Sequence, residues 1–280
     1  SVSLRGSTSE QVMVYLDGVL LNDASGGGVD LSNISLADVK AVEIYRGNAP
    51  IEFGKASVGG VVNIKTLRTQ KKANGQVSIG YGSFDTWKAT ALLNHKPGQF
   101  DYLFSGEFLD TENDFEFKNT NGTLWNPDDD RTEKRENAQI RQVNLLGKIG
   151  YDLGGRTRIS LVNQWFSKDQ GLASWNNNPD NDATLDTRRN ITSLKFAKDD
   201  VTHLHLNTAT QLDVSWMEEE FTDLKSQVGL GTQHTRNTTL RYGFNTYANW
   251  ITNQNTLTAT ADIRYETYDP QDLTDQDTPR

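Results

Sequence analysis

Cysteine is absent from this chain of 280 residues, which excludes disulfide bonds and thiolate metal sites within it. Histidine occurs only four times. The sequence contains neither the G-x-S-x-G motif of serine hydrolases nor the G-K-[ST] ending of a phosphate-binding loop. The net charge of −9 argues against binding to nucleic acid. We therefore expect a protein that is not an enzyme and that needs no cofactor of its own.

Long apolar runs are also missing. The mean hydropathy is −0.64, and no stretch approaches the roughly 18–20 apolar residues that a membrane-spanning helix needs. A strand of a membrane barrel needs only about 9–11 residues, and alternate side chains can be polar because they face the lumen. The composition therefore excludes a helical membrane protein and leaves a membrane β-barrel open.

Residues 1–70 are rich in glycine and predict a small unit of mixed structure. An apolar run is closed by a turn at Asp17-Gly18, and three consecutive glycines lie in the loop Asn22–Gly28. Roughly 70 residues with this much glycine bury only a thin core, so we expect the unit to pack against a larger one. The expected elements are strands at Val12–Leu16, Val39–Tyr45 and Val61–Ile64 and a short helix at Leu36–Asp38 capped by Ser35.

Residues 75–280 alternate apolar and polar side chains, which is the pattern of strands with two different faces. Counting these stretches predicts about nine strands. An apolar face opposite a strongly polar one is typical of a barrel with lipid outside and water inside. Several apolar faces end in aromatic residues, as the girdles of such barrels do: Tyr81, Trp87, Tyr151, Trp216, Trp250 and Tyr265.

The predicted connections are short and long by turns, which indicates a barrel with tight turns at one rim and long loops at the other. Tight turns are expected near Lys96-Pro97-Gly98, Gly154-Gly155, Asp199-Asp200 and Thr252-Asn253, and long polar loops at about 110–137, 169–186 and 218–232. The connection at Ser83-Phe84-Asp85 departs from this rule, because it is short on the long-loop side. A soluble β-sandwich or propeller is the alternative, but its strands average only about 5–6 residues.

Four stretches within the first 66 residues, in their order and spacing, resemble the second half of the plug of TonB-dependent outer-membrane receptors. They are Leu4-Arg5-Gly6, VMVYLDGVLL (12–21), DVKAVEIYRG (38–47) and FGKASVGGVVNIKT (53–66). The resemblance implies a mainly β fold, with residues 1–70 as the C-terminal half of a small, glycine-rich α+β plug domain. Residues 75–280 would be the N-terminal part of an antiparallel transmembrane β-barrel. Because such barrels have about 22 strands, about nine would form an incomplete wall, and we expect a longer protein.

The resemblance also implies a function. Members of the family take up scarce, large nutrients such as ferric siderophores or cobalamin across the bacterial outer membrane. The partner protein TonB, powered by the proton gradient, opens the plug. We expect TonB to bind through a segment that precedes this chain, outer-membrane lipid and lipopolysaccharide to surround the barrel, and the transported ligand to carry iron or cobalt. A passive porin or a surface adhesion barrel is the alternative, although neither needs a plug.

Carried over by position, the plug motif comprises Arg5, Gly6, Arg46, Gly47, Gly54, Gly59, Gly60 and Asn63. We interpret the glycines as backbone requirements rather than ligand contacts. Arg46 is expected between plug and wall, where it could form a strong ion pair with Glu107 or Asp213, both of which face the predicted lumen. The alternative for Arg46 is a solvated turn residue.

Candidate substrate contacts are expected on the outer side. Asn22, Asp23 and Ser25 lie in the loop that corresponds in order to an apical plug loop of the family. Trp125 and Trp175 lie in the first two long loops, where an indole could stack on a planar ligand. Packing within the loops is the alternative for both tryptophans.

Acidic clusters in the long loops offer oxygen ligands that suit Ca²⁺. Asp180, Asp182 and Asp186 are the candidates, and Asp128-Asp129-Asp130 forms a second cluster. Neither has the spacing of an EF-hand loop, and a solvated acidic loop is the competing interpretation. We expect no other metal site.

Overall fold

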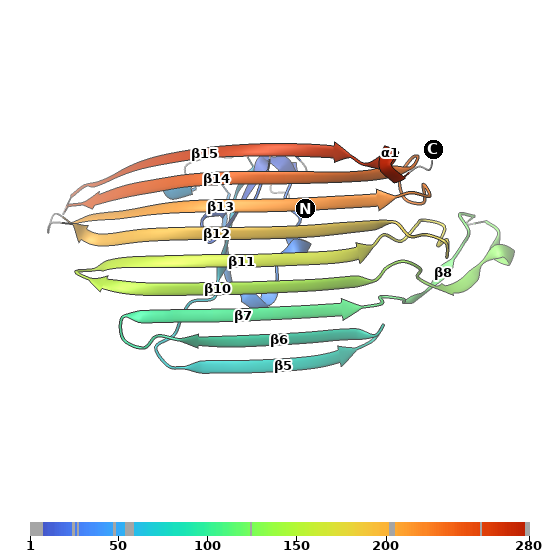
Figure 1. Cartoon of the computed structure of the whole chain (residues 1–280), viewed down its shortest axis with the longest axis horizontal. Coiled ribbons are helices and arrows are strands. Elements are labelled where there is room, and N and C mark those ends of the chain that lie inside the picture. The colour runs from blue at the N-terminus through green and yellow to red at the C-terminus, as the bar shows by residue number, and fades with distance from the viewer. Residues whose placement is uncertain are drawn as a thin grey trace.

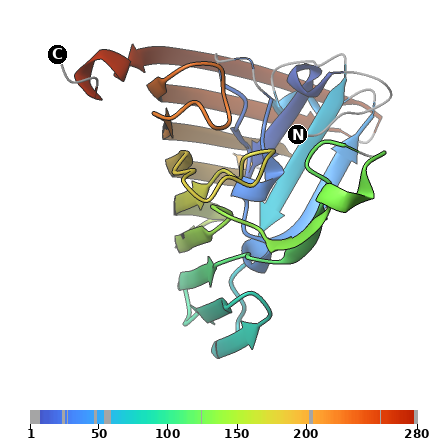
Figure 2. The same cartoon turned by 90° about the vertical axis from the view of Figure 1, so that its right-hand side faces the viewer.

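The computed structural model describes residues 8–23, 26, 28–46, 49–53, 59–123, 125–201, 205–252 and 254–277. It contains a nine-stranded antiparallel sheet, here called the wall, and a four-stranded sheet built from the first 66 residues, here called the N-terminal unit. The N-terminal unit lies against one face of the wall (Figures 1 and 2). Strands dominate the fold, as the sequence predicts.

The N-terminal unit is a mixed sheet in the order β2-β1-β4-β3, in which β1 and β4 run parallel and the other pairs antiparallel. Its predicted strands are confirmed, and its helices are single 3-10 turns. The Ser35 hydroxyl caps the turn η3 by accepting a hydrogen bond of 3.2 Å from the Ala37 amide, as expected. The elements are η1 (Ser9–Gln11), β1 (Val12–Leu16), β2 (Val19–Leu20), η2 (Leu31–Asn33), η3 (Leu36–Asp38), β3 (Val39–Tyr45), η4 (Ile51–Phe53) and β4 (Gly60–Thr66).

The two faces of the small sheet carry two separate apolar clusters. One cluster contains Val12, Val14 and Leu16 of β1, and it includes Ile191 from the wall. On the other face Tyr15 packs on Phe53 with ring centroids 4.8 Å apart, and the Tyr15 hydroxyl donates a hydrogen bond of 2.9 Å to the Phe53 carbonyl. The thin core is therefore extended by a wall side chain, as expected for a small, glycine-rich unit.

The wall is an open meander in which each strand pairs with its neighbours in chain order, from β15 at one edge to β5 at the other (Figure 1). Nine strands are present, as predicted. They are β5 (Asn74–Gly82), β6 (Thr86–His95), β7 (Phe100–Thr111), β10 (Ile140–Gly154), β11 (Thr157–Gly171), β12 (Thr184–Val201), β13 (Leu206–Asp223), β14 (Gln233–Ile251) and β15 (Thr256–Asp272). The short α1 (Thr274–Asp277) follows β15.

Long loops leave one end of the wall, and short turns join the strands at the other (Figure 1). The strands nevertheless extend further than predicted. β11 continues to Gly171, β12 begins at Thr184 and β13 continues to Asp223, inside the segments expected to be loops. These ends are mostly polar, with Leu185 opposite Phe221 as an isolated apolar pair, so they give little alternation signal although their backbones pair in regular register. The first long loop contains an unpredicted hairpin of β8 (Glu116–Asn119) and β9 (Arg131–Lys134).

The two faces of the wall differ in the way that the alternation predicts. The inner face is polar and is covered by the N-terminal unit; Asp101, Glu107 and Asn144 are 2%, 6% and 0% exposed. The outer face carries large apolar side chains that remain exposed, including Ile79, Phe104, Leu145, Leu161, Leu194, Leu212 and Ile263. In a sandwich these side chains would be packed between two sheets, and in a propeller the strands would divide into four-stranded blades. The single nine-stranded sheet has neither of these alternative folds.

Two rows of aromatic residues bound the outer apolar band. Trp250 lies in the row nearest the short turns, opposite Leu206 and Leu257. In the row nearest the long loops, here called the upper row, Trp165 stacks on Trp216 with ring centroids 6.2 Å apart. The stretch from Leu206 to Trp216 spans about 33 Å along β13. At a strand tilt of about 35–45° this corresponds to a height of roughly 23–27 Å, which matches the apolar band of about 25 Å in membrane barrels. Beyond the upper row the outward side chains become charged, as in the pair Arg188–Glu218.

Among the described residues, no helix is both long and apolar enough to cross a bilayer.

Candidate functional site

Wall arginines hold backbone carbonyls of the N-terminal unit. Arg241 on β14, whose side chain is almost completely buried, donates one hydrogen bond to the Leu20 carbonyl and one to the Asn22 carbonyl, each 2.5 Å long. Arg189 on β12 donates to the Asn33 carbonyl at 2.9 Å. Hydrogen bonds from a guanidinium are stronger than those between neutral groups. These two arginines therefore fix the segments on either side of the Asn22–Gly28 loop to the wall.

Asp17 links the turn between β1 and β2 to the rest of the molecule. Its carboxylate accepts hydrogen bonds from the Thr66 amide at 2.9 Å and the Thr66 hydroxyl at 2.5 Å. It also forms an ion pair of 2.8 Å with Lys148 on β10. The turn predicted at Asp17-Gly18 is thus a joint between β1, β4 and the wall.

A buried carboxyl pair lies at the contact of η3 with the wall. Asp38 of the N-terminal unit and Glu107 of β7 are 1% and 6% exposed. Asn144 donates a short hydrogen bond to Asp38, and Ser35 donates one of 3.0 Å to Glu107, which also pairs with Lys88 at 2.9 Å. Burial raises the pKa of Asp38, against hydrogen bonds from Ser105 and Asn144, and the nearby charge of Glu107 raises it further.

Arg46 does not form the pairing expected from the sequence. It is exposed at the end of β3 and, among the described residues, it makes no hydrogen bond or ion pair with the wall. Glu107 pairs with Lys88 instead, and Asp213 interacts with Arg241 and Arg264. The physical reason is placement: β3 is an edge strand of the small sheet, and the nine wall strands leave its side chains Val42 and Ile44 exposed.

The remaining motif residues that the structure describes, Gly59, Gly60 and Asn63, have structural roles within the N-terminal unit. Gly60 begins β4 with a φ of 113°, which a residue with a side chain rarely adopts, and the Gly59 amide donates to the Gln11 carbonyl at 3.1 Å. Asn63 is buried and donates to Glu43 at 3.1 Å, joining β4 to β3. Arg5, Gly6, Gly47 and Gly54 lie outside the described residues.

Asn22, one of the expected substrate contacts, is occupied by its own unit. Its side-chain oxygen accepts from the Val14 amide at 2.8 Å, and its side-chain nitrogen donates to the Val12 carbonyl at 2.9 Å. The amide group therefore continues the edge of β1 and is not available to a ligand in this conformation. Asp23 is half-buried beside it, and Ser25 lies outside the described residues. A contact between this loop and a substrate stays a prediction for Asp23 and Ser25.

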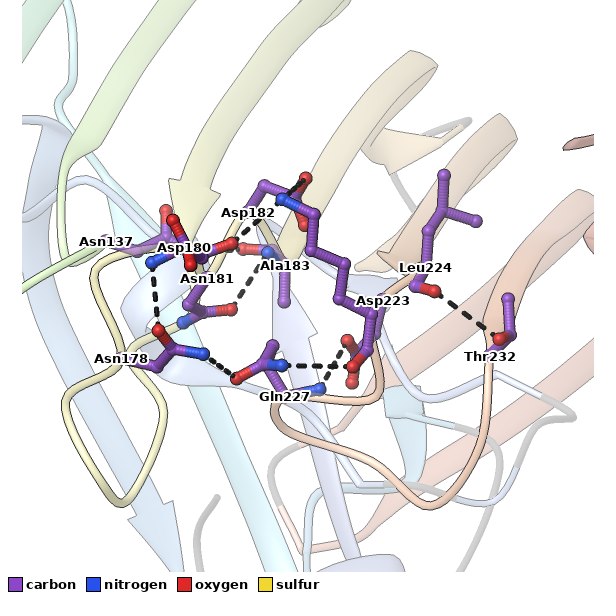
Figure 3. A network of polar contacts seen from close by, with 11 residues as sticks. Asn137, Asn178, Asp180, Asn181, Asp182, Ala183, Asp223, Leu224, Gln227 and Thr232 are labelled. Atoms are coloured by element: carbon purple, nitrogen blue, oxygen red, sulfur yellow. Dashed lines mark hydrogen bonds and ion pairs between the residues drawn. The ribbon is translucent and has the colours of Figure 1, made fainter.

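The three long loops are tied together by side-chain amides (Figure 3). Asn137 of the first loop donates to the Ala183 carbonyl at 2.8 Å and to the Leu172 carbonyl at 3.3 Å. Asn178 of the second loop donates to Gln227 of the third at 2.6 Å. These bonds cross between segments that lie far apart in the sequence, so the loops form one ordered cluster.

Asp223 orders the third loop from its first residue. Its carboxylate accepts hydrogen bonds from the backbone amides of Gln227, Val228 and Gly229, at 2.8, 2.8 and 2.7 Å. The side chain is completely buried. One carboxylate therefore satisfies three amides of a loop that has no secondary structure of its own.

The calcium candidates do not converge. Asp182 forms an ion pair of 2.9 Å with Lys225, whose ammonium group also donates to the Asp180 carbonyl (Figure 3). Asp186 belongs to β12, where it pairs in register with Asp169 and Glu220. In the second cluster Asp130 pairs with Lys118 at 2.6 Å. Within the described part of the chain, no three acidic or histidine side chains are grouped as metal ligands. The sequence did not reveal that Lys225 would neutralise this loop.

Trp125 and Trp175 are the most exposed aromatic residues of the loop cluster, at 82% and 79%. A side-chain carbon on Gly122 would lie 4.0 Å from the Trp175 ring, so the second loop reaches the first at Gly122, three residues before Trp125 in the sequence. The structure thus brings the two predicted tryptophans to the same loop cluster and leaves both rings accessible. Their role in binding stays a prediction.

Sequence reasoning missed the wall residues that hold the N-terminal unit, chiefly Arg189, Arg241 and Lys148. The alternation places all three on the inner face. An inward charge is equally compatible with a wet lumen, so the pattern alone could not identify these residues as contacts.

Comparison with known proteins agrees with this geometry. Residues 1–61 match the family described as the TonB-dependent receptor plug domain. The vitamin B12 transporter BtuB of Vibrio vulnificus is 26% identical over 227 residues, which is 80% of this chain and 33% of that protein. The chain therefore spans about a third of the length of this relative.

Solved structures show the same fold. The copper transporter OprC superposes with a TM-score of 0.74 at 12% identity, over 96% of this chain and 41% of its own. The FrpB iron transporter of Neisseria meningitidis (F5-1 variant) superposes with a TM-score of 0.73 at 22% identity, over 96% and 43%. In both cases the likeness extends across the N-terminal unit and the wall together.

Proposed function

We propose, since the chain belongs to the TonB-dependent outer-membrane receptors, that it forms part of an energised importer of a scarce, large nutrient. Residues 1–70 would be the C-terminal half of the plug, and residues 75–280 would begin the barrel. TonB would act through a segment that precedes this chain. The names of the relatives support cargo that contains a metal, since they include transporters of vitamin B12, iron and copper.

The observation that carries the proposal is the attachment of the N-terminal unit to the inner face of the wall. Arg189 and Arg241 hold backbone carbonyls, and Lys148 holds Asp17. A separate globule fixed in this way obstructs the lumen of a barrel. A passive porin or an adhesion barrel does not need such an obstruction. The bonds are few and polar, so work done on the unit can break them without unfolding the wall.

The outer parts of the molecule fit the same proposal. The ordered loop cluster would receive the nutrient first, with Trp125 and Trp175 as accessible rings. The apolar outer band would face lipid, and the charged outward pairs beyond Trp216, such as Arg141–Asp110 and Arg188–Glu218, would lie at the level of the lipopolysaccharide head groups.

Uptake by the full-length receptor tests the proposal. Cells that lack their own receptors would express it and receive labelled ferric siderophores, heme and cobalamin in turn. We expect accumulation of at least one compound, and we expect it to stop when the proton gradient is collapsed while binding at the cell surface persists. Accumulation that continues unchanged without the gradient would favour a passive pore.

A further inference from the structure

Two adjoining cavities lie between the N-terminal unit and the wall, on the side of the short turns. The first, of about 380 Å³, is bounded by the Asp17-Gly18 turn, the end of β4 and wall strands β10–β14. The second, of about 570 Å³, continues along residues 67–71 towards the turn after β10. They share the lining residues Arg68, Lys148, Ser160 and Val162, so they form one space.

This space is basic although the chain is acidic. Seven basic and three acidic side chains line it, a balance of +4 in a chain with a net charge of −9. The three acidic residues are all engaged: Asp17 with Lys148, Asp101 with Arg158, and Asp152 with both Lys96 and Arg158. A hollow lined by charge of one sign concentrates ions of the opposite sign.

Three of the seven basic side chains find no counter-charge within the described part of the chain. Lys65 is neutralised by Glu43 at 2.5 Å. Among the residues that the structure describes, Arg68, Lys71 and Lys195 form no ion pair. Lys195 points inward from β12, and Arg68 and Lys71 follow β4, so the unpaired charges approach the space from both of its sides.

We propose that this space binds a multiply charged anion, and that the anion is the nutrient in transit towards the short-turn side. Arg68 and Lys195 are its principal binding residues. An anion held between them contacts the wall and the segment 67–71 that joins the N-terminal unit to it. The assignment rests on the function proposed above and sharpens it: the imported compound carries negative charge, as complexes with carboxylate, catecholate or phosphate groups do, and a neutral compound is disfavoured.

The first test is binding of pyrophosphate to the purified full-length receptor, measured by calorimetry at low salt. The variant Arg68→Gln/Lys195→Gln removes the charges of the two principal binding residues and leaves Lys71 in place. The control Lys72→Gln/Lys198→Gln removes the same charge from the neighbouring linker residue and from the opposite face of β12. We expect about a tenfold loss of affinity in the first variant, on the order of one hydrogen bond to a charged group, and none in the control. Equal affinity in all three proteins, or equal loss in both variants, would overturn the site.

The second test is passage of the nutrient. Uptake rate is divided by the amount bound at the cell surface, for the compound that the wild-type receptor imports. We expect this ratio to fall several-fold in Arg68→Gln/Lys195→Gln and to be unchanged in the control. An unchanged ratio in both variants would refute the role in transit. If the proposed energised import were wrong, wild-type uptake would continue after the proton gradient is collapsed. The pyrophosphate measurement on purified receptor does not depend on the gradient, so the two proposals can fail separately.

Discussion

Trp125 and Trp175 offer the most direct test at the scale of single side chains. Both rings are accessible on an ordered loop cluster, and stacking on an aromatic ring contributes about 0.5–1.5 kcal/mol beyond burial. We expect Trp125→Ala and Trp175→Ala each to weaken surface binding of the nutrient roughly three- to tenfold, without changing the uptake rate of bound molecules. Equilibrium binding to whole cells measures this effect. Leu230→Ala, which truncates an apolar loop residue that is 95% exposed, is the control.

Asp38 makes the attachment of η3 depend on pH. Burial raises the pKa of Asp38 in the folded protein above its unfolded value of about 3.9. The folded protein therefore binds more protons, and the attachment becomes more stable as pH falls through the folded pKa, until it levels off below the unfolded pKa. We expect hydrogen exchange of the amides in β3 to slow over this window in the wild type and to lose this component in Asp38→Asn.

The opposite sign is expected at Asp30, which provides the control. Burial would raise its pKa, but hydrogen bonds from the Ser32 side chain and backbone hold the pKa of Asp30 below its ordinary value. Its contribution is present above the unfolded pKa and is lost as pH falls through the folded pKa. In the wild type, protonation of Asp30 at low pH should make amide hydrogen exchange near η2 faster. Asp30→Asn should abolish this acceleration, whereas Asp38→Asn should abolish a slowing. The same pH profile in wild type and Asp38→Asn would contradict the assignment to Asp38.

Among the elements, the third long loop depends on one side chain. Asp223→Ala would leave three backbone amides of residues 227–229 without their acceptor, and a hydrogen bond to a charged group contributes about 1.5–3 kcal/mol. We expect the loop to lose its order while the wall remains folded. Protease added to intact cells should then cut within 224–232 several times faster than in the wild type. Asp180→Ala, at an acidic loop residue that shares its backbone carbonyl but not its carboxylate with Lys225, should be cut at the wild-type rate.

The sequence predicted those elements whose two faces differ. Alternation predicted about nine wall strands with one apolar face each, because lipid and lumen impose opposite demands on neighbouring residues. It missed the ends of β11, β12 and β13, which are mostly polar, and the hairpin β8–β9, whose strands of four residues are too short to show a period. The alternation pattern could not predict the contacts between the N-terminal unit and the wall. Nothing in the sequence distinguishes Arg241, which the fold brings to the Leu20 carbonyl, from Arg46, which stays exposed.

For the molecule as a whole, the central question is what keeps the N-terminal unit in place. Most of its contacts with the wall are polar. Arg241 provides two charge-assisted hydrogen bonds, to the carbonyls of Leu20 and Asn22. Hydrogen bonds to charged groups contribute about 1.5–3 kcal/mol each. Removing the guanidinium should therefore loosen the outer end of the unit while Lys148 and Arg189 continue to hold other parts of it.

Arg241→Gln in the full-length receptor should make the outer membrane leaky without any energy input. We expect cells that express it to become several-fold more sensitive to vancomycin, a polar compound too large for ordinary porins, and to remain so after the proton gradient is collapsed. The matched control is Arg236→Gln, five residues earlier on β14 and on its outer face, where the guanidinium pairs with Glu220 rather than with the N-terminal unit. If both variants excluded vancomycin as the wild type does, Arg241 would not be what holds the unit closed.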